Sequence, residues 1–305
     1  MEKIVLIEEK KINFNGIDKC FFNDNGNIGS FTAYQSERVE PKLVLNLVDN
    51  PQRGIVAEAQ YKWSANCSHL LYDVLADHLI IRKITGSNKL IHSVTDLSRQ
   101  ILSYLGSAYY PSNVTIENKL DDVSEGASYL ENPTRFDGYK HSFISDLIKE
   151  SLSGLAIKDE NYPENIIIYR RIKNNLKRNR NINNVKMLQA ELDRRIGKFV
   201  LVDMEDYTLN GQIKIFKNAK RIISVHGSAL VWLNFCDQGT KCIEIITPIF
   251  RNNDFIKSDF WVMSQQAGVI HKSYYTDKII GEDIYAPHEI DIDIDINHIV
   301  ELLLD

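Results

Sequence analysis

The sequence predicts an α/β protein whose second half forms a doubly wound sheet of parallel strands. Over residues 165–246, short β-branched runs alternate with longer stretches in which apolar residues recur at helical spacing. Glycine and polar turn residues separate these runs. At 305 residues, 44% of them apolar, the chain is long enough to bury a core and to form more than one domain.

The first half of the chain alternates in the same way after an opening region of short strands. Asn-Gly turn signals occur twice in the first 55 residues, which we interpret as strands and turns. Helical apolar spacing predicts two helices, over residues 61–84 and 141–155. Between them we expect strands at residues 89–92 and 114–117 and a helix at residues 96–105.

The elements of the second half are predicted from the same patterns. The strands fall at residues 165–170, 199–203, 221–225 and 241–246, and the helices at residues 183–196, 208–218 and 229–235. A polar connection at residues 158–163 marks the domain boundary. We therefore expect a first domain of residues 1–155, a second of residues 156–280, and a tail of residues 281–305 with a helix at residues 297–304.

The turn after the strand at residues 221–225 has the composition of a phosphate-binding site. His226, Gly227, Ser228 and Ala229 lead from this strand into the next helix. A tight strand-to-helix turn leaves backbone N–H groups and the positive end of the helix dipole at the carboxyl edge of a sheet. An ordinary crossover in a parallel sheet has the same pattern, so both interpretations stay open for this stretch alone.

A carboxylate and a basic run accompany the turn. Glu244 lies in an otherwise apolar strand, and because burying a lone carboxylate costs free energy, it should be paired or lie at an open strand end. Arg170, Arg171 and Arg178 follow the strand that begins at residue 165. Such a run is usually a solvated basic face, but at the carboxyl edge of the same sheet its guanidinium groups favour a diphosphate.

Composition argues against several classes of protein. The formal net charge of −5 and the isoelectric point near 5.9 argue against a general nucleic-acid binder, and the cations at residues 170–180 lack the interleaved aromatic residues of an RNA-binding surface.

The four cysteines include no Cys-x-x-Cys pair, so neither a zinc cluster nor a disulfide framework is expected. The N-terminus does not resemble a signal peptide and no apolar run is long enough to span a membrane. We expect a cytoplasmic protein, either soluble or peripheral at the inner face of the membrane.

Asp291, Asp293 and Asp295 form an Asp-x-Asp pattern of the kind that can hold a metal ion. Strict alternation of aspartate with isoleucine is also the pattern of a half-buried strand whose acids face solvent. We favour the strand and expect no metal site here.

The motifs of the second half resemble those of glycosyltransferase family 61. The chain contains IIIYRR at residues 166–171, VDMEDYTLNGQIKIFKNAKRIISVHGSALVWLNF at residues 202–235 and GTKCIEI at residues 239–245. These are similar to the family's strand-end arginine, acidic strand end, Gln-x-x-x-Phe-x-x-Ala helix, His-Gly turn and Gly-Thr-x-x-Ile-Glu strand. The matching positions are Arg170, Glu205, Gln212, Phe216, Ala219, His226, Gly227, Leu230, Gly239, Thr240, Ile243 and Glu244. Upstream, NCSHLLYDVLADHL at residues 66–79 is similar to the family's Asn-x-x-His-Trp-x-x-Asp segment, and the likeness extends over residues 61–305.

The resemblance implies a GT-B architecture, in which two Rossmann-like domains face each other across a cleft. It also implies inverting transfer of a sugar from a nucleotide-diphosphate donor, which we expect to be UDP-linked, to a hydroxyl of a polysaccharide or lipid-linked glycan such as a bacterial capsule precursor. Residues 1–155 would bind the acceptor and residues 156–280 the donor. No cofactor, metal or nucleic acid is implied. The implied donor site comprises Arg170, Arg171, Arg178, Glu205, His226, Gly227, Ser228, Ala229 and Glu244.

The upstream segment supplies His69 and Asp73 as candidate catalytic residues, four apart on one predicted helix. One of them would take the proton of the acceptor hydroxyl, and Asp73 could orient His69. Without the resemblance, a helix-cap histidine and a surface acid explain the pair equally well. Leu70 stands where the family has tryptophan, and Ser228 and Ala229 stand where it has Ala-Gly. The alternative function is a non-catalytic, nucleotide-binding scaffold subunit of a polysaccharide-synthesising complex.

Overall fold

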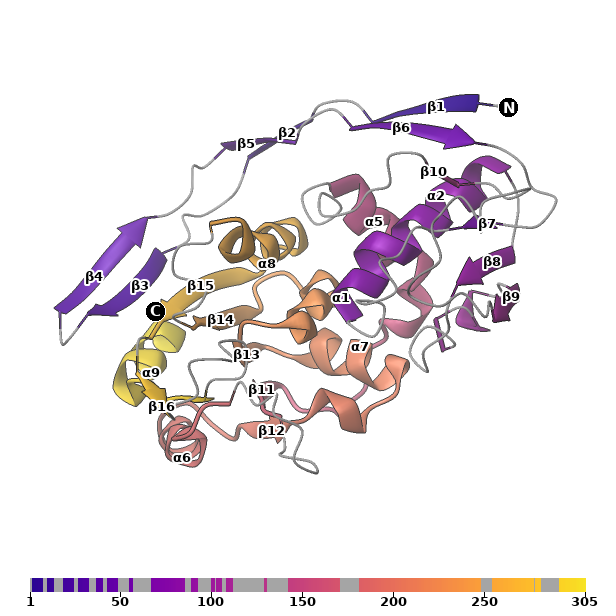
Figure 1. The fold of residues 1–305 in the computed structure, drawn as a ribbon. Coiled ribbons are helices and arrows are strands. Elements are labelled where there is room, and N and C mark those ends of the chain that lie inside the picture. Colours follow the sequence, from indigo (N-terminus) through magenta and orange to yellow (C-terminus); the bar gives the residue numbers. More distant parts are fainter. Residues whose placement is uncertain are drawn as a thin grey trace. The chain divides into compact units, whose positions relative to one another are not determined.

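We describe the protein from a computed structural model, shown in Figure 1. Its backbone is described for residues 2–7, 10–13, 19–24, 27–32, 37–40, 43–48, 55–56, 67–85, 89–92, 100–101, 103–105, 108–111, 129–130, 142–170, 181–247, 254–276, 278–280 and 291–305. Side chains are described for residues 67–68, 70–72, 75–84, 100–101, 103–105, 142–170, 181–247, 260–276, 278–280 and 291–305. The strand predicted at residues 114–117 lies outside the described residues.

The chain divides into two compact units. Unit 1 comprises Met1–Ile12 and Glu37–Leu155, and unit 2 comprises Asn13–Ser36 and Ala156–Asp305. Within the described residues, no helix is both long and apolar enough to cross a membrane. The mixed α/β composition and the parallel sheet of unit 2 agree with the predicted fold class, whereas the GT-B arrangement and the domain limits stay predictions.

In the part of unit 1 that the structure describes, short strands accompany two longer helical segments, and residues 100–101 and 103–104 are also helical, within the helix predicted at residues 96–105. The first segment runs without interruption through α1 (Cys67–His69), the π-helix η2 (Leu70–Leu75) and α2 (Ala76–Thr85), which confirms the helix predicted there. The second is α5 (Ser142–Ser151), followed by a 3-10 turn, η4 (Ser153–Leu155). The strands are β1 (Glu2–Ile7), β2 (Lys10–Asn13), β5 (Glu37–Glu40), β6 (Leu43–Val48), β7 (Ile55–Val56), β8 (Lys89–His92), β9 (Ala108–Pro111) and β10 (Tyr129–Leu130).

Unit 2 is built around one sheet with the strand order β12-β11-β13-β14-β15-β3-β4. Every neighbouring pair from β12 to β3 is parallel, and β4 is antiparallel to β3. The chain passes from β11 outward to β12 and then returns to β13 on the other side of β11, so the strand order reverses between β11 and β13. The strands are β11 (Asn165–Ile168), β12 (Val200–Val202), β13 (Arg221–Val225), β14 (Lys241–Ile246), β15 (Ile270–Tyr275), β3 (Lys19–Asp24) and β4 (Asn27–Thr32).

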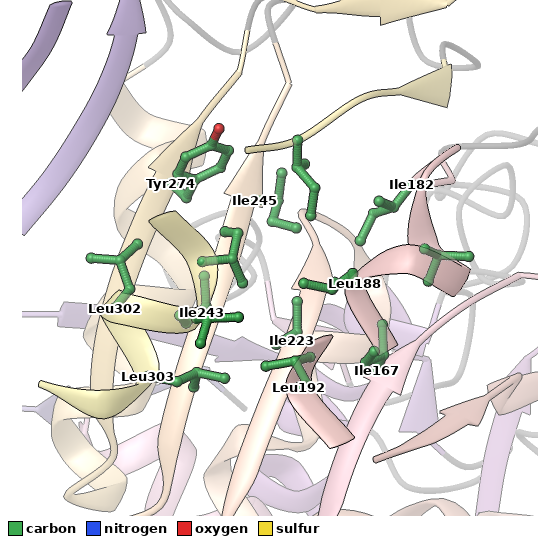
Figure 2. Packing of buried hydrophobic residues seen from close by; sticks show 14 of the residues in the cluster. Ile167, Ile182, Leu188, Leu192, Ile223, Ile243, Ile245, Tyr274, Leu302 and Leu303 are labelled. Carbon is green, nitrogen blue, oxygen red and sulfur yellow. The ribbon is translucent and has the colours of Figure 1, made fainter. Parts of the chain in front are cut away.

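One face of this sheet packs against α6 (Val185–Arg195) and α9 (Ile296–Leu304). Figure 2 shows the side chains gathered between these helices and strands β11, β13, β14 and β15. Because side chains alternate along a strand, every second residue of each strand faces this core. The cluster includes Ile167, Ile223, Ile243, Ile245 and Tyr274 from the strands and Leu188, Leu192, Ile299, Leu302 and Leu303 from the helices.

The alternate residues of the strands face the other side of the sheet. This side is covered by η6 (Ser228–Phe235) and α8 (Asp254–Ala267), with α7 (Leu209–Asn218) packed on η6. Phe260 of α8 lies against His226, with 5.2 Å between the ring centroids. Unlike the aliphatic core of Figure 2, this face carries polar side chains in the middle of the sheet, among them Ser224, Glu244 and Ser273.

The tail predicted at residues 281–305 includes a helix of the unit 2 core. Asp295 caps α9 by accepting the His298 N–H, and two lysines of the sheet donate to the carbonyl oxygens of its last turn. The other two aspartates of the alternating run also have structural partners: Asp291 accepts the backbone N–H of Asn181, and Asp293 accepts from the side chain of Asn183. β17 (Asp291–Ile292) is a short strand paired with β16 (Ile279–Ile280), so the strand interpretation of this run is confirmed in part.

The predicted elements differ from the observed ones mainly at their ends. β13 and β14 have the predicted bounds, and α6, α7 and α9 begin or end within two residues of them. The helix predicted at residues 229–235 is instead a 3-10 helix, η6, whose first hydrogen bond runs from Leu230 N to Gly227 O. The spacing of apolar residues does not distinguish the two helix types over a helix of eight residues, six of them buried.

Candidate functional site

The carboxyl ends of four neighbouring strands place polar residues along one edge of the unit 2 sheet. Glu205 follows β12, Arg170 follows β11, His226 follows β13 and Thr247 follows β14. Parallel strands end at the same edge, so these residues succeed one another along it. Open α/β sheets bind ligands where the strand order reverses, which here lies between β11 and β13. The edge near Arg170 and His226 is therefore the candidate site.

A chain of hydrogen bonds extends from His226 into the covered face of the sheet. Nδ1 of His226 lies 2.5 Å from Oε1 of Glu244, and Nε2 of His271 lies 3.0 Å from Oε2 of the same carboxylate. Nδ1 of His271 then lies 2.7 Å from Oγ of Ser264 in α8. We call His226, Glu244, His271 and Ser264 the buried relay. It links the strand end to the helix that covers this face.

The buried relay keeps a carboxylate ionised inside the protein. Glu244 is 0% exposed. Burial raises the pKa of Glu244, but hydrogen bonds and charge attraction from His226 and His271 outweigh burial and lower this pKa to about 2. The prediction that Glu244 must be paired is confirmed. Both carboxylate oxygens are held by imidazoles, and direct contact of Glu244 with a donor stays a prediction.

The turn after His226 presents backbone N–H groups at the start of η6. Gly227 is extended, with φ and ψ both at 171°, and the first helical bond is donated by Leu230. The N–H groups of Ser228 and Ala229 precede that bond, and the first N–H groups of a helix have no partner inside it. Ala229 lies within a helical turn, a conformation open to alanine, so the change from the family's glycine introduces no backbone strain. The turn retains the features of an anion site.

Arg170 follows β11, the strand next to β13, and is paired with Glu205. Its Nη2 lies 2.5 Å from Oε1 of Glu205, and both side chains are about half exposed, at 43% and 52%. The backbone around Arg170 is fixed by Asn181, whose side chain accepts the Arg170 N–H and donates to the Arg170 carbonyl oxygen. An exposed ion pair of this kind is weak and can rearrange when an anion arrives. Arg171 and Arg178 lie outside the described residues.

Several motif residues of the resemblance have structural roles. Gln212 accepts from the indole N–H of Trp232 and donates to the carbonyl oxygens of Met204 and Tyr207, so it joins α7, η6 and η5 (Met204–Asp206). Thr240 donates to the carbonyl oxygen of Ala219. The remaining motif side chains Phe216, Leu230 and Ile243 are buried, and Gly239 has a positive φ of 86° that favours glycine.

Thr247 has an unusual environment for a buried hydroxyl. It is 2% exposed, and within the described part of the chain its Oγ1 has no hydrogen-bond partner. β14 runs beside β13 with Ile245 opposite Val225, so Thr247, just after β14, lies at the same edge of the sheet as the His226 turn. A buried hydroxyl without a partner is costly, so this one marks a place where a ligand group could bond. Among the described residues, no group of three or more acidic, histidine or cysteine side chains could hold a metal ion.

The two candidate catalytic residues lie on the helical segment of unit 1. His69 is the last residue of α1 and Asp73 lies within the π-helix η2, but the side chains of both lie outside those described. Their neighbours Leu70, Leu71 and Tyr72 are buried, so Leu70 replaces the family's tryptophan as a core residue. Short π-helical segments are rare and occur often at functional sites.

Sequence reasoning did not find three polar residues of this edge and face: Ser264, His271 and Thr247. No strand was predicted at residues 270–275, where β15 has the sequence IHKSYY, with buried His271 and Ser273 on the face shared with Glu244. A period-2 analysis of that strand could have shown a polar row on one face. No pattern in the sequence marks Ser264 or Thr247. Ser264 has its role only because α8 packs on this face, and Thr247 only because it follows the end of β14.

Comparison with known proteins adds one match. The family model described as Glycosyltransferase 61 matches residues 47–243, which is more than half of the chain. The matched span contains the helical segment of unit 1, Arg170 and the His226 turn, and it ends one residue before Glu244. A search of curated proteins found no match.

Proposed function

Because the chain belongs to the glycosyltransferase 61 family, we propose that it is an inverting enzyme that uses a nucleotide-sugar donor. The acceptor would be a hydroxyl group of a glycan or lipid-linked glycan in the synthesis of a surface polysaccharide or similar glycoconjugate. Family membership supports glycosyl transfer in general. The donor type, the stereochemical course and the acceptor class are proposals, and the arrangement of strand ends in unit 2 supports them.

The donor's diphosphate would bind at the carboxyl edge between β11 and β13. The observation that carries this proposal is the convergence there of Arg170, the His226–Glu244 pair and the start of η6. When the bond between the anomeric carbon and the β-phosphate oxygen breaks, the leaving nucleoside diphosphate keeps the electron pair and gains charge. The N–H groups of Ser228 and Ala229 and the guanidinium of Arg170 would stabilise that charge.

His226 would contribute a hydrogen bond from its ring to the same phosphates. Its Nδ1 is held by Glu244, which fixes the ring and leaves Nε2 for the donor. Because Nδ1–H is donated to Glu244, a hydrogen on Nε2 as well would make His226 an imidazolium ion, and in that form Nε2 would donate to a phosphate oxygen. Thr247 would bond to the donor at the same edge of the sheet, because a hydroxyl or phosphate oxygen of the donor would satisfy its buried Oγ1. Glu205 already bonds to Arg170, so it would either hold the guanidinium in place for the donor or give up this bond when a phosphate binds.

The acceptor side of the reaction is assigned to unit 1. A base removes the proton from the acceptor hydroxyl, and the oxygen then forms its bond to the anomeric carbon on the face opposite the leaving phosphate, which inverts the configuration. We assign this role to His69, oriented by Asp73, on the basis of the resemblance at residues 66–79. The π-helix that contains Asp73 supports a functional role for this segment.

The proposed reaction needs no metal ion. The positive groups at the strand ends would neutralise the leaving group, and each aspartate of residues 291–295 already has a structural hydrogen bond. Asp291, for example, accepts a backbone N–H and is partly buried, and burial raises its pKa. The run is therefore better suited to holding the tail in place than to binding a cation.

A direct test measures binding and turnover with a panel of nucleotide sugars. Saturation-transfer NMR would identify the donors that bind, and release of the nucleoside diphosphate with and without acceptor glycans would measure turnover. We expect one donor class to bind and to be consumed in excess chelator. Binding without hydrolysis or transfer under any condition would favour the non-catalytic scaffold, and no binding of any nucleotide sugar would contradict the proposal.

A further inference from the structure

The hydrogen atoms of the buried relay can be assigned from its geometry. Ser264 has one hydroxyl hydrogen, and its Oγ lies 2.6 Å from the carbonyl oxygen of Phe260, which can only accept. The same Oγ lies 2.7 Å from Nδ1 of His271. If Ser264 donated to His271 instead, two oxygen atoms would face each other at 2.6 Å with no hydrogen between them. The hydroxyl therefore donates to Phe260, and Nδ1 of His271 carries a hydrogen that it donates to Ser264.

The other side of His271 gives a second donated hydrogen. Nε2 lies 3.0 Å from Oε2 of Glu244, whose pKa is lowered to about 2 in spite of burial, so the carboxylate is ionised and can only accept. Both ring nitrogens of His271 then carry hydrogens, and His271 is an imidazolium ion. It is 4% exposed and lies in the middle of the sheet beside a fully buried carboxylate.

We propose that His271, held by Ser264, is a positioning residue that remains protonated to balance the charge of Glu244 and thereby orients His226 for the donor. His271 is too deeply buried to touch a donor, so it acts through Glu244. With the charge of Glu244 balanced from behind, the carboxylate stays ionised and accepts the Nδ1–H of His226. This inference rests on the proposed function for its effect on the donor, but the protonation of His271 can be tested without any ligand.

Loss of His271 would change both the charge and the hydrogen bonding of the site. Without the imidazolium, Glu244 would remain as a buried charge with one partner fewer or would take up a proton and donate to His226. Either state makes the site less favourable for a diphosphate, because the positive charge of one imidazolium, that of His271 or that of His226, is no longer balanced against Glu244 and the site loses one unit of positive charge. The other titratable side chains of the described residues on this face of the sheet are Cys242 and Tyr275, and Cys236 lies at the end of η6.

The first experiment records the imidazole signals of the full-length protein labelled with ¹⁵N at pH 7. We expect both ring nitrogens of His271 to show the chemical shifts of protonated nitrogen, with the signals assigned by their loss in His271→Gln. We also expect the Nδ1–H signal of His226 to be present in the wild type and to shift in His271→Gln. A His271 ring with one unprotonated nitrogen at pH 7 would overturn the proposal.

The second experiment measures the affinity for UDP by calorimetry. We expect His271→Gln to weaken binding by about 10-fold to 100-fold, as for residues that orient the ligands of a metal site. Ser264→Ala, which removes only the acceptor of the Nδ1–H, should weaken binding less and should leave the fold intact. His298→Gln is the matched control, because His298 packs against Tyr274 on the opposite face of the sheet, and its UDP affinity should equal that of the wild type.

The outcomes separate this inference from the proposed function. Folded His271→Gln and Ser264→Ala proteins that bind UDP like the wild type would overturn the positioning role. If His271→Gln does not fold, the Nδ1–H signal of His271 is assigned by its shift in Ser264→Ala, and the wild-type imidazole spectrum and the Ser264→Ala affinity decide. A wild-type protein that binds no nucleoside diphosphate would contradict the proposed function, while the spectrum would still support or overturn the protonated state of His271.

Discussion

Replacing Glu244 with glutamine would remove a buried charge while preserving the size of the side chain. Glu244 is fully buried and accepts hydrogen bonds from two imidazoles. Glutamine has one acceptor oxygen and one NH₂ group, so one imidazole N–H would face another donor. The relay lowers the pKa of Glu244 from its ordinary value of 4.5 to about 2. One pKa unit corresponds to about 1.4 kcal/mol, so we expect Glu244→Gln to lose about 3 kcal/mol of unfolding free energy at pH 7.

The loss should depend on pH in a defined direction. Because the pKa of Glu244 is lower in the folded protein than in the unfolded chain, its stabilisation is fully present above 4.5 and disappears as the pH falls toward about 2. The difference between wild type and variant should therefore shrink over that interval. Urea unfolding followed by tryptophan fluorescence measures it, since Trp232 and Trp261 are buried in unit 2. Trp63 falls in unit 1, and a Trp63→Phe background removes its signal.

Glu205→Gln is the matched control for this experiment. Its carboxylate belongs to the same unit and also bonds to a cationic side chain, but it is about half exposed. Exposed ion pairs contribute little to stability, so the unfolding midpoint should hardly change. Two outcomes would refute the reasoning about the buried relay. One is an equal loss of unfolding free energy in Glu205→Gln and Glu244→Gln, and the other is a loss in Glu244→Gln that does not change with pH.

Four further predictions concern the proposed reaction. Arg170→Ala should weaken UDP binding by ~1.5 to 3 kcal/mol, the usual size of a hydrogen bond to a charged group, and unchanged affinity in calorimetry would return Arg170 to a solvated basic face. Asp293→Asn should leave donor consumption intact in excess chelator, and an activity that is lost with chelator and restored by manganese or magnesium would contradict metal independence. Thr247→Val should raise the unfolding free energy by about 1 kcal/mol, because it removes a buried hydroxyl without a partner, while it weakens donor binding; a less stable variant with normal binding would contradict this role. His69→Ala should lower turnover by ~10²-fold to 10⁴-fold with little effect on donor affinity, and Asp73→Asn should lower it less; the opposite order in one assay would exchange their roles.

The elements around the candidate site could be predicted because their local signals agree. β13 and β14 are mainly apolar, isoleucine-rich runs bounded by turn residues, and both have their predicted bounds. α7 begins after Thr208, which accepts the Gly211 N–H as a helix cap. In each case, propensity, apolar spacing and turn chemistry indicate the same structure, which is why the sequence alone was sufficient.

The contacts of the site could not be predicted in the same way. Glu244 and His271 are 27 residues apart, and the register of β14 beside β15 decides that their side chains meet. A shift of one residue would turn His271 to the opposite face, and no pattern within either strand fixes that register. The π-helix in unit 1 was missed for a related reason, since it differs from an α-helix by a local change that apolar spacing does not reveal.

The relay also explains why a glutamate can occupy the centre of a sheet in this protein. A lone carboxylate at that position would destabilise the fold, and replacing it with an apolar residue would be the simplest remedy. Here imidazoles from the two neighbouring strands hold both oxygens of the carboxylate, and a serine of α8 bonds to one of these imidazoles, His271. Of the four residues of the buried relay, only His226 lies at the strand end where a donor would bind. Burying the other three costs desolvation free energy, and the fold alone does not require them. Buried polar groups that exceed the needs of the core are expected where they position a functional side chain, and the buried relay leads to His226.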